Sequence, residues 1–118
     1  MRLDPRQAAT AYFDAWRRRD SDLLRSILAD DVEFFGPLAE VKGADEYVES
    51  IQGLWNMTTE LVIHTMCVDG DDALTWFDLH TTIALATPVA NWCHLEDGKL
   101  ARVMVTFDPR GMLGIKPD

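Results

Sequence analysis

One amide stands out among the residues whose chemistry could serve a binding or catalytic site. Around Asn91 the sequence alternates between apolar and other side chains, as it does in a strand with one buried face. This alternation places Asn91 beside Cys93 on the buried face. A buried amide needs partners for its hydrogen bonds, and nearby backbone or water could supply them. In the functional alternative, Asn91 donates to the carbonyl oxygen of a bound ligand.

His64 is the side chain best suited to move a proton. The unperturbed pKa of a histidine, about 6.5, suits general acid–base work near neutral pH. Strand alternation puts His64 on one face with Val62 and Met66, so a position toward the pocket is one alternative. The alternative is a packed or surface histidine that takes no part in chemistry.

Other catalytic signatures are missing from the sequence. The three histidines are dispersed and the two cysteines, Cys67 and Cys93, form no CxxC pair, so we expect no metal centre. No glycine-rich phosphate loop and no GxSxG nucleophile elbow occur, and we expect no cofactor. Two cysteines in a chain of this size are expected to be reduced and buried.

Three helices are predicted in the first half of the chain, each with apolar residues at helical spacing. The first opens at Asp4-Pro5, where Asp suits the N-cap and Pro the first helical position. The second is capped by Asp20 or Ser21, and the third begins near Gly43. After Asn56 the apolar spacing changes to about two, which predicts strands. The expected strands are Val32–Phe35, Glu60–Val68, Ala73–Ala86, Ala90–Glu96 and Leu100–Asp108, with Pro88 interrupting the chain between two of them.

This order of elements predicts an α+β domain with helices packed on one face of an antiparallel sheet. The more uniformly apolar face of each strand should meet the helices. That face comprises Phe77, Leu79, Asn91, Cys93, Val103, Val105 and Phe107. The opposite face carries Trp76, Trp92 and Met104, and exposed aromatic patches usually mark an interface. We therefore expect a homodimer packed sheet to sheet.

Length and charge narrow the class of protein further. The chain has 118 residues, which is ordinary for one domain, and we expect this domain at residues 1–110 with a C-terminal tail at 111–118. A net charge of -9 opposes binding to nucleic acid and to anionic membranes. No apolar run approaches the ~20 residues that span a bilayer, and no apolar signal region opens the chain. We expect a cytoplasmic protein.

Four stretches, taken in their order and spacing, carry a family resemblance. They are the helix with Tyr12 and Trp16 leading into Arg19-Asp20, then residues 28–34, residues 42–47, and residues 96–100 running on to 105–110. Together they cover nearly the whole chain. It resembles the SnoaL-like group of the nuclear transport factor 2-like superfamily, which includes ketosteroid isomerases, polyketide cyclases and scytalone dehydratase. The resemblance implies a cone-shaped, strongly curved sheet wrapped around three N-terminal helices, an apolar pocket at its open end, and often a homodimer.

The resemblance also implies roles for residues of this sequence. Asn91 falls where ketosteroid isomerases place the protonated acid of their oxyanion hole, and Tyr12 falls where they place its tyrosine donor. Two such donors could stabilise an enolate or hold a carbonyl. The catalytic aspartate of those enzymes aligns with Gly36, so proton transfer would need another base, for which His64 is the candidate. The other expected pocket residues are Trp16, Phe34, Trp55, Phe77, Leu79, Cys93, Val103, Val105 and Phe107.

Three functions fit this sequence. The first is an isomerase, cyclase or dehydratase acting on an apolar, carbonyl-bearing ring compound held by Tyr12 and Asn91. The second is a binding module with the same pocket and no chemistry, because aromatic walls serve either purpose. The third is a dimerisation domain whose pocket residues are plain core.

Overall fold

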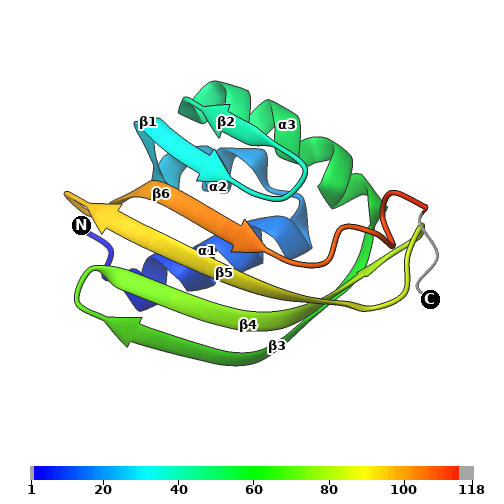
Figure 1. Ribbon diagram of the computed structural model, residues 1–118. Helices are drawn as coiled ribbons and strands as arrows, with labels where there is room; N and C mark the ends of the chain where they lie inside the picture. The colour runs from blue at the N-terminus through cyan, green and yellow to red at the C-terminus, as the bar shows by residue number, and fades with distance from the viewer. Residues whose placement is uncertain (1, 115–118) are drawn as a thin grey trace.

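The computed structural model describes residues 2–114 of the chain and shows an α+β architecture with one curved sheet (Figure 1). The three helices all lie in the first half of the chain, and strands dominate its second half, as predicted. The helices are α1 (Pro5–Arg18), α2 (Ser21–Ile27) and α3 (Ala44–Met57). The strands are β1 (Leu28–Phe35), β2 (Glu40–Lys42), β3 (Thr58–Asp69), β4 (Asp72–Thr81), β5 (Thr87–Glu96) and β6 (Lys99–Thr106).

The six strands form one sheet in the order β2-β1-β6-β5-β4-β3. Neighbouring strands run antiparallel except β1 and β6, which run parallel. The sheet is therefore mixed, whereas antiparallel pairing throughout was predicted. Parallel neighbours need a long connection between them, and here α3 and four strands separate β1 from β6 along the chain.

Helix α1 forms the wall against which the sheet curves. It begins with a capping box, in which the Asp4 carboxylate accepts from the Gln7 N–H at 2.8 Å and the Gln7 side chain accepts from the Asp4 N–H at 3.0 Å. Its buried stripe includes Tyr12, Phe13 and Trp16. Phe13 packs edge-on against Phe77 of β4, with ring centroids 5.0 Å apart, which ties the helix to the sheet. In the view of Figure 1, α1 lies behind the sheet near β5, and α3 lies at the other end of the sheet beside β1 and β2.

The connection between β4 and β5 differs from its predicted form. Strand β4 ends at Thr81, earlier than the expected Ala86, and β5 already includes Pro88, which was expected to interrupt it. Pairing between β5 and β6 starts only at Ala90. Pro88 therefore lies where β5 has a neighbour on one side only, and there a missing N–H is tolerated.

The segment after β6 folds back toward the β4–β5 connection. Residues 109–114 form turns, and the Leu113 N–H donates to the Pro109 carbonyl at 3.0 Å. A Cβ on Gly111 would lie 3.5 Å from that of Ala84, so the two segments touch. Of the expected tail at 111–118, residues 115–118 lie outside the described part. In residues 2–114, no helix combines the length and the apolar character that a membrane crossing requires.

Candidate functional site

A cavity of about 280 Å³ lies between α1, α3 and the inner face of the sheet. Its floor carries three buried polar side chains, those of Tyr12, Tyr47 and Asn91. Its mouth carries exposed apolar side chains, among them Leu38 and Ile83. The remaining lining is apolar apart from Ser50 and comprises Trp16, Phe34, Gly36, Pro37, Ala39, Ile51, Leu54, Met57, Phe77, Leu79, Val89, Val105, Phe107 and Met112.

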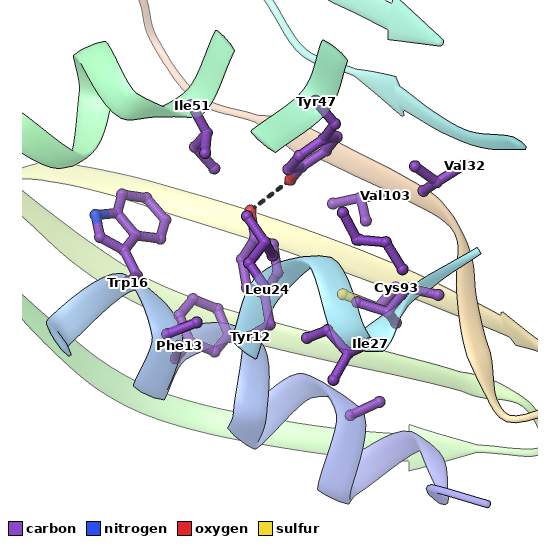
Figure 2. Close-up of a cluster of buried hydrophobic side chains, with 14 of the residues drawn as sticks. Tyr12, Phe13, Trp16, Leu24, Ile27, Val32, Tyr47, Ile51, Cys93 and Val103 are labelled. Carbon is purple, nitrogen blue, oxygen red and sulfur yellow. Dashed lines mark hydrogen bonds between the residues drawn. The ribbon is translucent and has the colours of Figure 1, made fainter. Parts of the chain in front are cut away.

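Tyr12 and Tyr47 form the hydrogen-bonded pair at the floor. Their hydroxyl oxygens lie 2.8 Å apart, and both side chains are almost fully buried (Figure 2). Burial raises the pKa of Tyr12, and the hydrogen bond with Tyr47 opposes this effect only in part. Burial and the neighbouring Tyr12 also raise the pKa of Tyr47 well above its usual value. Both phenols are therefore neutral, and one of their two hydroxyl hydrogens remains for another acceptor.

Asn91 supplies a second group of donors beside this pair. Its side-chain oxygen accepts a hydrogen bond from the Cys93 thiol at 3.0 Å. Burial raises the pKa of Cys93 to about 12, so the thiol keeps its proton. The Asn91 Nδ2 atom, in a residue only 2% exposed, has no hydrogen-bond partner among the described residues. Buried amide hydrogens without an acceptor are unusual, and here they belong to a residue that lines a cavity.

Most of the expected pocket residues meet at this cavity. Those in its lining are Tyr12, Trp16, Phe34, Phe77, Leu79, Asn91, Val105 and Phe107. Trp55, Cys93 and Val103 are buried in the core outside the lining. On α3, Ile51 and Leu54 line the cavity. Trp55 follows Leu54 directly, so its side chain leaves the helix about 100° further around the axis. Cys93 lies two residues after Asn91 on the same face of β5, and Val103 is its register partner on β6.

His64 does not reach the cavity. Its side chain is 45% exposed, and Nε2 lies 2.9 Å from a carboxylate oxygen of Asp78. The pairing of β3 with β4 shifts between Ile63 and Thr65, so His64 is the extra residue of a β-bulge. Beyond the bulge Met66 packs against the core, whereas simple alternation predicted that Met66 and His64 share a face.

An aromatic ring packs against Gly36, the position that the sequence resemblance aligns with the catalytic aspartate of ketosteroid isomerases. A Cβ at position 36 would lie 3.1 Å from two ring atoms of Phe34. The Phe34 ring in turn packs edge-on against Tyr47, with centroids 5.1 Å apart. The Gly36 N–H donates to the Ala39 carbonyl at 2.9 Å and closes the turn into β2. The wall at this point is therefore apolar and tightly packed.

Two other residues differ from expectation. Tyr47 was not among the predicted site residues, whereas its hydroxyl belongs to the polar floor. Its spacing from Ile51 and Leu54 marks the cavity-facing stripe, and a hydroxyl on such a stripe was the available signal. Cys67 is exposed, although both cysteines were expected to be buried.

The outer face of the sheet carries the residues expected at a dimer interface. Trp76 is 47% exposed and Met104 36% exposed. Trp92 is half-buried, and its Nε1 donates to the Asp72 carboxylate at 2.8 Å. The same carboxylate lies 2.7 Å from His94 Nδ1. Partial burial tends to raise the pKa of Asp72, but the hydrogen bonds with His94 and Trp92 outweigh it and lower this pKa.

Within residues 2–114, no group of three or more His, Cys, Asp or Glu side chains could hold a metal ion.

Comparisons with known proteins agree with this architecture. Among curated protein sequences none matches the chain. A nuclear transport factor 2-like protein of unknown function from Cytophaga hutchinsonii superposes with a TM-score of 0.83 at 21% identity, over 96% of this chain and 97% of the other. A candidate ketosteroid isomerase from Kribbella flavida has a TM-score of 0.76 at 21% identity, over 86% and 75% of the two chains. A candidate polyketide cyclase from Sinorhizobium meliloti has a TM-score of 0.77 at 21% identity, over 83% and 92%.

The sequence itself matches a known family. The SnoaL-like domain family covers residues 9–103, which span α1 through most of β6 and include Tyr12, Tyr47 and Asn91. The fold relatives fall in the nuclear transport factor 2-like superfamily, as the sequence resemblance implied. This chain belongs to the SnoaL-like domain family.

Proposed function

We propose that this protein binds an uncharged, largely apolar ring compound through a carbonyl oxygen. The observation that carries the proposal is the unpartnered Nδ2 of Asn91 at the floor of an apolar cavity. A carbonyl oxygen has two lone pairs, which can accept from Asn91 and from the free hydroxyl hydrogen of the Tyr12–Tyr47 pair. Such an acceptor would remove the cost of leaving these buried donors unsatisfied.

The lining favours an uncharged ligand and binding without chemistry. Among the described residues around the cavity, none is an Asp, Glu, His, Lys or Arg. A buried ligand charge would therefore lack a counter-ion, and its desolvation would be costly. The same residues offer no general base for taking a proton from carbon. Gly36, the position where related isomerases carry that base, stands beside the Phe34 ring instead.

Isomerase or cyclase chemistry is a second candidate function, because the fold relatives include candidate enzymes of both kinds. In that case Tyr12 and Asn91 would act as oxyanion donors to an enolate. Exchange of hydrogen at the carbon beside a bound ketone separates the two functions. We expect 1-tetralone in D2O, followed by NMR, to exchange no faster with the protein than without it. Accelerated exchange would establish enolisation and contradict binding without chemistry.

A matched pair of ligands tests the carbonyl contact. The bicyclic ketone 1-tetralone and its parent hydrocarbon tetralin differ by one oxygen and have nearly the same shape. We expect tighter binding of 1-tetralone by calorimetry or thermal shift. Asn91→Leu should reduce this preference roughly fivefold, since one hydrogen bond contributes about 1 kcal/mol. Tyr12→Phe should reduce it in the same direction.

Asn56→Ala is the control, because it removes an exposed amide near the end of α3 outside the cavity. It should leave the preference for 1-tetralone unchanged. An equal preference in Asn91→Leu and the parent would contradict the assignment of Asn91. If neither 1-tetralone nor any other neutral ketone binds, the cavity is plain core.

We further propose that the outer sheet face pairs two copies of the chain. The support is the exposure of Trp76 and Met104 on adjoining parts of a sheet face that no helix is seen to cover in Figure 1. Large aromatic and Met side chains are enriched at protein interfaces relative to other surfaces.

A further inference from the structure

The side-chain amide of Asn91 can present either of two groups to a ligand. Its oxygen accepts hydrogen bonds and its NH2 group donates them, so a half-turn of the amide exchanges an acceptor for donors at the same place. Cys93 is buried in the core outside the cavity lining, whereas Asn91 belongs to the lining. The end of the amide that faces Cys93 therefore points away from the cavity, and the opposite end determines which ligand groups the floor accepts.

Cys93 contacts the oxygen end of this amide. Its Sγ lies 3.0 Å from Asn91 Oδ1, and both residues are on the inner face of β5. The thiol is completely buried, and its raised pKa keeps it protonated at neutral pH, so it remains a donor. A hydrogen bond in such a dry interior is electrostatically stronger than the same bond in water. The contact therefore opposes the half-turn that would direct the amide oxygen toward the cavity.

A second donor competes for the same oxygen. The hydroxyl pair of Tyr12 and Tyr47 has one hydrogen left over, and both tyrosines line the cavity with Asn91. If the amide directed its oxygen toward this pair, the free hydroxyl hydrogen would be used inside the protein and Nδ2 would face Cys93. A ligand carbonyl would then lose both donors of the floor at once. The bond from Cys93 thus keeps two groups of donors free for a ligand.

We propose that Cys93 is a positioning residue, which sets the ligand specificity of the floor by holding the Asn91 amide with its NH2 group toward the cavity. This inference rests on the proposed function and adds the residue that makes the floor a donor site for carbonyl compounds. Cys93 does not line the cavity and touches no ligand there. Its effect on binding is transmitted through Asn91.

Two substitutions of nearly equal size separate this hydrogen bond from packing. Cys93→Ser keeps a donor beside Asn91 Oδ1, and Cys93→Ala removes the donor while leaving a similar space. The measured quantity is the ratio of the dissociation constants of tetralin and 1-tetralone from calorimetry. We expect this preference for the ketone to fall at least about fivefold in Cys93→Ala and to stay within about twofold of the parent in Cys93→Ser.

Val103→Ala is the packing control. Val103 is the register partner of Cys93, is equally buried and also lies outside the cavity lining. Its truncation removes buried volume beside Cys93 without removing a donor, so the preference for 1-tetralone should be unchanged. Thermal unfolding of each variant checks that the fold is retained.

The S–H stretching band of Cys93 measures the contact without any ligand. In a Cys67→Ala background, Cys93 supplies the only thiol of the chain. We expect its infrared band at a lower frequency than that of a free thiol, because donation to an oxygen weakens the S–H bond. Asn91→Leu in the same background should move the band to higher frequency. A band that Asn91→Leu leaves in place would overturn the proposal.

The binding outcomes separate this inference from the proposed function. A preference for 1-tetralone that falls equally in Cys93→Ser and Cys93→Ala, or in neither, would overturn the role of Cys93 and leave the carbonyl site standing. A fall in Val103→Ala as large as in Cys93→Ala would do the same. Equal binding of 1-tetralone and tetralin by the parent would overturn the carbonyl site and, with it, the specificity role of Cys93.

Discussion

The hydroxyl oxygens of Tyr12 and Tyr47 lie 2.8 Å apart in the interior and join α1 to α3 by one buried hydrogen bond. The two residues are 35 positions apart in the sequence. The pair thus fixes the distance between the two helices at the floor of the cavity. It also sets how many donors the floor can offer to a ligand.

Single and double substitutions should reveal the coupling of this pair. Tyr12→Phe or Tyr47→Phe alone should each lower the free energy of unfolding by about 1–3 kcal/mol, because each leaves one buried hydroxyl without its partner. The double variant should lose less than the sum, since no orphaned hydroxyl remains. Urea denaturation of all four proteins measures this. Additive losses would show that the two hydroxyls are not coupled.

At Thr75, by contrast, we expect a substitution to stabilise the protein. Its hydroxyl is buried, has no hydrogen-bond partner among the described residues, and belongs to the residue opposite Asn91 in the β4–β5 register. Thr75→Val should raise the free energy of unfolding by about 1 kcal/mol, because an unsatisfied polar group is replaced by an apolar one of the same shape.

Thr58→Val is the matched control for Thr75. The Thr58 hydroxyl accepts from Trp16 Nε1 at 2.9 Å and donates to the Leu54 carbonyl at 2.7 Å. Its loss should destabilise by about 1–3 kcal/mol. If Thr75→Val destabilises as Thr58→Val does, the Thr75 hydroxyl has a partner, such as a bound water.

Alkaline pH should unfold the protein through groups that are buried without charge. The folded-state pKa of Cys93 rises from 9.0 to about 12, and those of both tyrosines rise above 10.0. Their stabilisation is complete below pH 9 and is lost as the unfolded chain ionises above it. For Cys93 the loss is about 2 kcal/mol at pH 10.5. Urea titrations between pH 8 and 10.5 should show it.

Cys93→Ala should remove this part of the pH dependence. Cys67→Ala is the control, because its thiol is exposed in the folded protein. An unchanged slope in Cys93→Ala, relative to Cys67→Ala, would mean that the buried thiol is not a source of alkaline instability.

The proposed pairing of sheet faces predicts the mass in solution. Multi-angle light scattering at micromolar concentration should give twice the chain mass of 13.3 kDa. Trp76→Lys should give the single-chain mass, because a charge would be buried at the interface. Leu85→Lys, on an 89% exposed residue of the β4–β5 connection, should leave the dimer intact. A monomeric parent protein would contradict the proposal.

Periodicity predicted the helices and strand faces well, because burial of one face is a local property of the sequence. The inner positions of β4 and β5, such as Phe77 and Asn91, followed directly from alternation. His64 did not, because a β-bulge shifts the register by one residue and the sequence around it carries no marker. The parallel pairing of β1 with β6 was missed because it depends on contacts between distant segments.

The polar floor was predicted only in part for a similar reason. Asn91 could be recognised as an amide on an apolar face. The partnership of Tyr12 with Tyr47 depends on how closely two helices approach, which apolar spacing does not encode. Cys93 lies on the predicted inner face of β5, but it is buried in the core and does not line the cavity. Alternation predicts the face of a strand on which a residue lies, and it does not predict how far along the strand the cavity extends.

The contact between Gly36 and the Phe34 ring couples two positions of the chain. A side chain at position 36 would begin 3.1 Å from that ring, and the ring also packs against Tyr47. A carboxylate at position 36 therefore requires the Phe34 ring to move by a few tenths of an ångström, or residue 34 to be smaller. The effect of a substitution at position 36 thus depends on which residue stands at position 34.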